Sequence, residues 1–257
     1  MSTEKSSPIP TPVRRQAGQS LREWLAVERD GFVFYAGGIT VSSVMLVGVV
    51  WLAWFRFRPL TPWLVTGAAA VLIVILALDV RSRLRSASSR AKGLRGELFT
   101  AEWLDDLTRA GYTVFHDLQG DRGNIDHLAV GPAGVLVIET KFRSKPPGAK
   151  VVYDGRRLLV GEFDATDAHL GQARACRDDV RRRLRERSPQ AGAVPVRAVL
   201  TYPGWDVQEC SGTEVWVLNP KRRIAAWAAQ EERREGRVAS EHMAAAIAVL
   251  DEWARRP

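Results

Sequence analysis

Two long uncharged apolar segments dominate the hydropathy pattern of the first third of the chain. Residues 31–55 and 59–78 contain no charged side chain, and at about 1.5 Å per residue each is long enough, as a helix, to cross the core of a bilayer. A pair of buried helices is the alternative, but uncharged runs of this length are scarce in soluble domains. The pattern therefore predicts a two-helix transmembrane hairpin over residues 31–78, preceded by a polar tail over residues 1–30.

The basic residues around these segments predict their orientation. Arginine and lysine gather before the first segment and after the second, whereas only Arg56 and Arg58 lie between them. By the positive-inside rule both termini are expected in the cytoplasm, in an integral protein of the plasma (inner) membrane. The first 30 residues lack the early apolar stretch of a signal peptide, so we expect the anchor to be retained. Residues 79–93 form a basic connector that is expected to attract anionic lipid at the bilayer surface.

From residue 94 onwards, short segments with strand-like patterns alternate with helical ones, which favours an α/β architecture. Leu94, Leu98, Leu104 and Leu107 recur at helical spacing and stop before Gly111. The predicted strands cover residues 112–115, 125–130, 135–140, 149–153, 157–160, 194–201 and 214–218, and further helices cover residues 165–187, 224–230 and 240–255. We expect one domain over residues 94–220, followed by C-terminal helices over residues 221–257.

Composition and charge limit the function classes. With 46% hydrophobic and 26% charged residues, the chain is neither disordered nor fibrous. The net charge of +8 belongs to residues 1–95, and the remainder sums to zero, so bulk charge is no evidence that the α/β domain meets DNA. Cys176 and Cys210 lack CxxC spacing and no HExxH pair is present, which argues against a disulfide framework or a structural zinc site. Reduced thiols in the cytosol are expected.

The second and third predicted strands carry the candidate chemistry. Residues 131–134, Gly-Pro-Ala-Gly, suit a tight turn between them. If Gly131 faces Gly134, then Asp126 stands directly opposite Glu139, and like charges in that position call for a cation between them. Close carboxylates suit Mg²⁺ or Mn²⁺. The strand period of two also places Lys141 on the same face as Glu139.

Two alternatives remain open at this hairpin. A left-handed Gly134 would allow a three-residue loop with a bulge, and Asp126 would then face Thr140 instead of Glu139. The hairpin could also be solvated, with its charges pointing outward. An Asp, a short gap and Glu-x-Lys are too common to identify a site by themselves.

Several motifs in order resemble the nuclease-related domain (NERD) family, which is similar in its core to the PD-(D/E)xK restriction-endonuclease-like superfamily. The resemblance covers roughly residues 93–220. It implies a restriction-endonuclease-like αβββαβ core. The motifs are Arg95-Gly96-Glu97, Gly123-Asn124-Ile125-Asp126-His127, Gly131-Pro132-Ala133-Gly134-Val135 and Ile138-Glu139-Thr140-Lys141.

The same resemblance implies roles for individual residues. Asp126 and Glu139 resemble the metal-binding acids, and Lys141 resembles the lysine that steadies the attacking water and the phosphate charge. Glu97 resembles the acid of the first core helix, a further candidate metal ligand, and Gln172 resembles a helix glutamine found in some members. Residues 124–126 depart from a literal Pro-Asp, a variation that the broader superfamily also shows.

Helical spacing supports part of this assignment. Glu97 shares a face with Leu94, Ala101 and Leu104 and so points inward, where an unpaired carboxylate is costly; the alternative is a partly exposed acid at the start of a helix. Gln172 borders an apolar stripe and could equally be a surface amide. His127 alternates with Asp126 along the strand, so a packed core histidine is expected rather than a ligand.

Together these features predict a membrane-anchored, Mg²⁺- or Mn²⁺-dependent hydrolase of nucleic acid, with DNA favoured over RNA. The alternatives are a tethered module that binds nucleic acid or protein without cutting it, and a sensor of anionic lipid. The arginine-rich helix at residues 174–187 could hold phosphates, although such a run is more often a solvated face with internal ion pairs.

Overall fold

The computed structural model describes residues 15–57, 62–121, 123–208, 213–221 and 224–255. The chain divides into two compact units, one formed by Ser20–Leu94 and one by Met1–Gln19 with Arg95–Pro257. The first unit is helical and the second contains all the strands. The candidate site residues all belong to the second unit.

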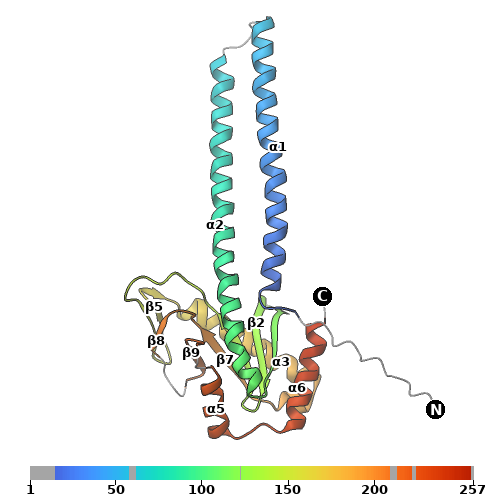
Figure 1. Ribbon diagram of the computed structural model, residues 1–257, viewed down its shortest axis with the longest axis vertical. Coiled ribbons are helices and arrows are strands. Elements are labelled where there is room, and N and C mark those ends of the chain that lie inside the picture. Colours follow the sequence, from blue (N-terminus) through green and yellow to red (C-terminus); the bar gives the residue numbers. More distant parts are fainter. Residues whose placement is uncertain (1–14, 58–61, 122, 209–212, 222–223, 256–257) are drawn as a thin grey trace, which may run out of the picture. The chain divides into compact units, whose positions relative to one another are not determined.

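Two long helices, α1 (Gln19–Phe57) and α2 (Pro62–Arg109), account for the first unit (Figure 1). They are longer than the sequence pattern predicts, because part of the expected polar tail and the whole basic connector at residues 79–93 are helical. Neither Gly nor Pro interrupts residues 68–92, so nothing in that stretch ends the helix before it reaches the predicted start at residue 94. The expected tail over residues 1–14 lies outside the described residues.

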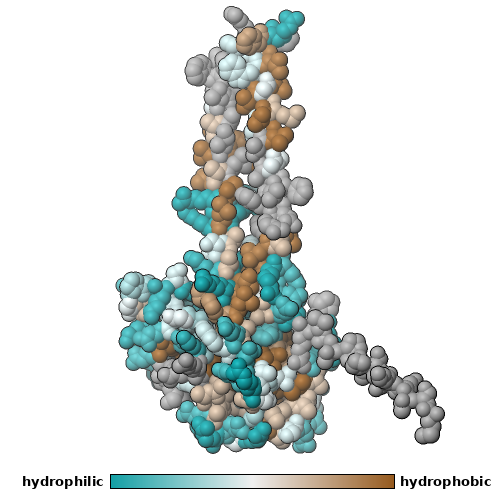
Figure 2. Space-filling view, in the orientation of Figure 1, coloured by the Kyte–Doolittle hydropathy of each residue, from teal (hydrophilic) through white to brown (hydrophobic). Residues whose placement is uncertain are grey.

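One part of this unit is long and apolar enough to cross a membrane. Residues Gly37–Arg56 have a mean hydropathy of 1.9, and apolar side chains are exposed along this stretch, Leu52 at 73% for example. Figure 2 shows apolar surface gathered along the same helices. The predicted second span, residues 59–78, begins among residues outside the described part, and no second candidate is found in the part that is described. The two-helix hairpin therefore stays a prediction.

The second unit is built on a five-stranded mixed sheet with the order β1-β2-β3-β7-β9. The first three strands are antiparallel neighbours, and the last two run parallel to β3. Strands β1 and β2 extend by a few residues beyond the strands predicted over residues 112–115 and 125–130. The strands are β1 (Thr113–Gly120), β2 (Gly123–Gly131), β3 (Gly134–Thr140), β7 (Val196–Thr201) and β9 (Val215–Leu218).

A smaller four-stranded sheet, ordered β6-β5-β4-β8, lies between β3 and β9 in the chain. Its strands are β4 (Lys150–Tyr153), β5 (Leu158–Val160), β6 (Phe163–Asp164) and β8 (Asp206–Gln208). The helices are η1 (Thr166–Leu170, a π-helical turn), α3 (Gly171–Arg187), α4 (Pro189–Gly192), α5 (Ile224–Glu235) and α6 (Ser240–Ala254). The mixed α/β class is as predicted, while β6, β8 and α4 were not predicted.

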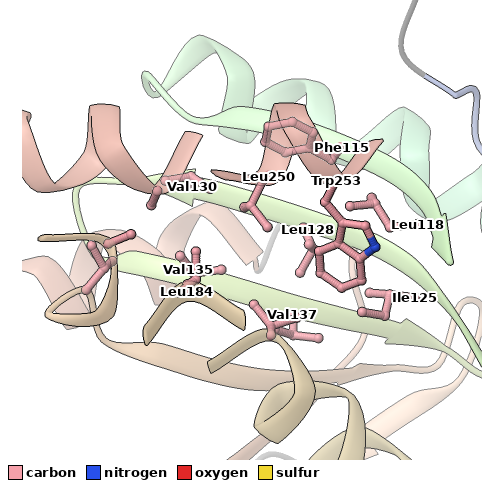
Figure 3. Packing of buried hydrophobic residues seen from close by; sticks show 14 of the residues in the cluster. Phe115, Leu118, Ile125, Leu128, Val130, Val135, Val137, Leu184, Leu250 and Trp253 are labelled. Atoms are coloured by element: carbon pink, nitrogen blue, oxygen red, sulfur yellow. The ribbon is translucent and has the colours of Figure 1, made fainter. Parts of the chain in front are cut away.

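Alternate residues of β3 pack on opposite faces of the large sheet. Val135 and Val137 join a core with α3, α4 and α6 (Figure 3), whereas Leu136 and Ile138 join a core with α5 and the end of α2. Because side chains alternate along a strand, the next residue, Glu139, is directed to the α3 side. The alternation of apolar residues in β3 thus determines the face of the sheet on which Glu139 lies.

The hairpin between β2 and β3 has the register that the tight turn predicts. Gly131 pairs with Gly134, and the ladder continues as far as His127 with Ile138. Gly134 does adopt a positive φ of 104°, but the register does not shift by one residue. A Cβ at Gly134 would lie 2.4 Å from the carbonyl oxygen of Pro195, so only glycine fits this position.

Candidate active site

Asp126 and Glu139 are neighbours at the open end of the hairpin. Continuing the ladder by one residue beyond His127 places the two acids opposite each other. The backbone N–H of Thr140 donates a hydrogen bond to Asp126 Oδ2 at 2.7 Å, which holds this carboxylate across the hairpin. Glu139 is only 4% exposed, and its Oε2 has no hydrogen-bond partner among the described residues. A buried carboxylate oxygen without a partner is costly unless another group binds it.

Lys141 connects the hairpin to α3. Its Nζ donates to Glu139 Oε1 at 2.6 Å and to Gln172 Oε1 at 2.7 Å. Gln172 is the second residue of α3, so the start of this helix delivers the amide to the end of β3. The lysine side chain is 19% exposed, which leaves the ammonium accessible to a bound anion.

Glu97 approaches the pair from α2. A Cβ on Gly96 would lie 2.4 Å from Phe142 Cβ, so a glycine in the Arg-Gly-Glu motif lets the helix pass close to the segment after β3. The negative charge of Glu97 contributes to raising the pKa of Asp126, as does that of Glu139. The structure thus brings together all five residues singled out from the sequence: Glu97, Asp126, Glu139, Lys141 and Gln172.

The electrostatics of the cluster disfavour two ionised acids. Burial raises the pKa of Asp126 well above its usual value, and the charges of Glu139 and Glu97 raise it further. Burial also raises the pKa of Glu139, an effect that the neighbouring Lys141 opposes. Nearby, burial together with the charges of these two acids raises the pKa of the Cys176 thiol to about 12. A divalent cation would relieve the repulsion that one lysine only partly offsets.

Comparison with known protein families gives a match over this part of the chain. Residues 92–203 match the model of the nuclease-related domain. The matched segment contains the whole cluster and indicates a nuclease-related function. It ends before β9, although β9 pairs with β7 in the same sheet, so the folded unit extends past the match. Comparisons with curated proteins and with solved structures found no match.

The donor set of the nuclease-related domain fits Mg²⁺ or Mn²⁺ better than zinc. Mg²⁺ is commonly held by one or two carboxylates and several waters, and Asp126 and Glu139 present carboxylate oxygens at one point. Among the described residues, no group of three or more His, Cys, Asp or Glu side chains is placed so that it could hold a metal ion, so the candidate protein ligands are the two acids alone. The orphaned Oε2 of Glu139 is the atom best suited to receive a cation.

Sequence reasoning missed a histidine and a tyrosine at the edge of the cluster. His169 Nδ1 lies 2.7 Å from the hydroxyl of Tyr202. Burial lowers the pKa of His169 to about 4, and the positive charges of Lys141 and Arg143 contribute. This imidazole is therefore neutral at physiological pH. Its position comes from η1, a π-helical turn for which the sequence pattern carries no recognisable signal.

His127 and the arginine-rich helix α3 are both accounted for by contacts within the protein. His127 is fully buried, with its Nδ1 2.8 Å from Nδ1 of His116 on the neighbouring strand, so it is a core residue as expected. Along α3, four of the guanidinium groups pair with acids. The pairs are Arg174 and Arg177 with Glu214, and Arg182 and Arg183 with Asp121 and Asp179.

Proposed function

We propose that the nuclease-related domain is a metal-dependent phosphodiesterase that hydrolyses the backbone of nucleic acid, with DNA as the favoured substrate. Asp126 and Glu139 would hold Mg²⁺ or Mn²⁺, and the negative charge of Glu97, which acts on Asp126, would add to the attraction for the ion. Lys141 and Gln172 complete the site. The observation that carries this proposal is the buried Oε2 of Glu139, which has no partner in the described residues and lies beside a second acid.

Each side chain of the site has a separate role in the proposed hydrolysis. A divalent ion bound at such carboxylates supplies polarisation of a phosphodiester and a lowered pKa for a water molecule. Lys141 places its ammonium beside Glu139 and within reach of the non-bridging phosphate oxygens, where it stabilises the developing negative charge. Gln172 accepts a hydrogen bond from Lys141 Nζ and so orients the ammonium. Thr140 N–H fixes the Asp126 carboxylate.

The activity can be tested with the full chain in detergent micelles. Labelled single-stranded DNA, duplex DNA and RNA are each incubated with Mg²⁺ or Mn²⁺, and the products are resolved on gels. We expect cleavage that requires the metal and stops when EDTA is added. Intact substrates under every condition, together with tight binding of the same substrates, would instead support the non-catalytic module on the same fold.

We further propose that the helix at Gly37–Arg56 anchors the chain in the membrane, with the basic segment at residues 79–93 beside anionic lipid and both termini in the cytoplasm. Mean hydropathy, exposure and the flanking basic residues support this. The full chain should remain in the membrane pellet of expressing cells after an alkaline carbonate wash. The double variant Leu46→Asp, Val49→Asp should be released, because each charge costs about 3 kcal/mol at the centre of a span. A wild-type chain found in the supernatant would refute anchoring.

A further inference from the structure

A cavity of about 720 Å³ opens along the segment that follows β3. Its walls come from the segment between β3 and β4, from the β5–β6 turn and from Trp205. We call it the loop cavity. Its lining includes Arg143, Lys150, Glu162, Phe163 and Trp205. This volume falls in the range of cavities that hold small organic ligands.

The loop cavity adjoins the candidate active site. Arg143 follows Lys141 by only two residues, so at most about 7 Å of chain separates their Cα atoms. His169 connects the two regions, because its ring lies 5.8 Å from that of Phe163 while the charges of Lys141 and Arg143 both lower its pKa. A polymer held at Lys141 is therefore close enough to contact Arg143 at the loop cavity as well.

Aromatic and cationic surfaces meet at the mouth of this cavity. The guanidinium of Arg143 lies over the ring of Phe163 at 4.5 Å from its centroid. Phe163 is 43% exposed, so part of its ring is open to solvent. A guanidinium plane and an aromatic ring that remain accessible together form a stacking platform for a planar base.

The charge of the adjoining segment is of one sign. Residues 141–150 contain Lys141, Arg143, Lys145 and Lys150 and no acid. Glu162 is the one acid in the lining, and Lys150 is paired with Asp206 at 3.4 Å. Although the domain as a whole is neutral, the path that leaves the acid cluster is therefore basic, as expected for a track that follows a phosphate backbone.

The cavity wall is held in place before any ligand arrives. Trp205, which is 3% exposed, donates from Nε1 to the backbone carbonyl of Arg143 at 3.1 Å. Asn219 Nδ2 in turn donates to the carbonyl of Trp205 at 2.7 Å. The segment that carries Arg143 is thus fixed to the core of the domain, which lowers the entropy lost on binding.

We propose that the loop cavity binds unpaired nucleotides of the strand that enters the active site, with a base stacked on the Phe163 and Arg143 platform and a phosphate near Lys141. The chain is accordingly selective for single-stranded nucleic acid. The identity of the polymer as nucleic acid rests on the proposed function, but the binding proposed here does not require cleavage. Base faces are hidden inside a duplex, so a stacking platform discriminates in favour of unpaired bases.

Binding can be measured separately from cleavage. Fluorescence anisotropy of the full chain in detergent micelles, with EDTA present, is recorded with labelled oligothymidylate and oligouridylate of about 20 nucleotides and with a duplex of the same length. We expect the single strands to bind at least about tenfold more tightly than the duplex. Phe163→Ala should weaken single-strand binding by about 5- to 100-fold, the range that loss of one stacked base gives, and Phe163→Trp should preserve it.

Arg143→Ala should also weaken single-strand binding and reduce the slope of log K against log salt by about 0.7. The matched control is Arg109→Ala, which removes the same charge from the far end of α2, about 18 Å along the helix from Glu97; its affinity should equal that of the wild type. Equal binding of duplex and single strand, or unchanged binding by Phe163→Ala, would overturn the proposal.

The outcomes separate this inference from the proposed function. If the chain never cleaves but binds single strands in a Phe163-dependent manner, the proposed role of the loop cavity is supported and the proposed hydrolase activity is refuted. If the chain cleaves with metal but binds single strands and duplex equally, and Phe163→Ala binds as the wild type does, the hydrolase activity is supported and the proposed role of the loop cavity is refuted. Oligothymidylate and oligouridylate in parallel report whether the loop cavity distinguishes DNA from RNA.

Discussion

Asp126→Asn is expected to abolish metal-dependent hydrolysis and at the same time to stabilise the metal-free protein. Asparagine keeps an oxygen that can accept the hydrogen bond from Thr140 N–H but removes the charge that burial, Glu139 and Glu97 disfavour. Loss of a metal-binding carboxylate should lower the rate by about 10³-fold or more. Removal of a carboxylate whose pKa is raised in the folded state should increase stability at neutral pH in the absence of metal.

The raised pKa of Asp126 also determines how the stability of the metal-free protein changes with pH. Because the pKa of Asp126 is raised in the folded state, the folded protein binds more protons than the unfolded one between the two pKa values. Its stability without metal should therefore fall as pH rises from about 4 through the folded pKa. Thermal unfolding in detergent with EDTA, followed by near-UV circular dichroism, should show this fall in the wild type and a weaker one in Asp126→Asn.

The control for this comparison is Asp178→Asn, which neutralises an exposed acid of α3 and should leave both rate and metal response unchanged. Adding Mg²⁺ or Mn²⁺ should raise the unfolding temperature of the wild type and of this control, but not that of Asp126→Asn. A less stable Asp126→Asn protein that still responds to metal would contradict the assignment of this residue.

Lys141→Ala is expected to lower kcat by about 10²- to 10³-fold with a smaller change in KM, because the ammonium acts on charge that develops in the transition state. The substitution also leaves Glu139 Oε1 without the donor at 2.6 Å. Since Lys141 lowers the pKa of Glu139, its removal should move metal binding to higher pH. Lys141→Arg, which keeps the charge, should restore part of the activity.

Lys221→Ala is the matched control for this variant, because Lys221 is an exposed lysine outside the cluster. It should retain the wild-type kcat and the wild-type pH profile of metal binding. Steady-state kinetics across pH, together with a metal titration, measure both effects. Full activity in Lys141→Ala would show that the lysine has no part in the chemistry.

Local patterns predicted most of the domain because its strands are short, apolar and clearly bounded. The turn before β3 predicted the register that pairs Gly131 with Gly134 and His127 with Ile138, whereas Glu97, which helical spacing predicted to point inward, is half-buried. Strands β6 and β8 escaped prediction because Phe163–Asp164 and Asp206–Gln208 are too short to show a period of two.

The helical unit shows a different limit of sequence reasoning. Charge and composition change at about residue 94, and we expected a new helix there, but α2 runs through this point without a break. Hydropathy reports the surroundings of a segment and does not mark where a helix ends, and neither Gly93 nor Gly96 ends α2. The position of His169 was also beyond prediction, since its partner Tyr202 is 33 residues away and comes near only through tertiary folding.

The pairing of Gly131 with Gly134 has a consequence for how this protein can diverge. Surface turns usually tolerate insertions and deletions, but one residue added between Pro132 and Ala133 would slide β2 against β3 and bring Thr140, rather than Glu139, opposite Asp126. Homologues that retain the chemistry should therefore keep the length of this turn and the glycine at the position of Gly134.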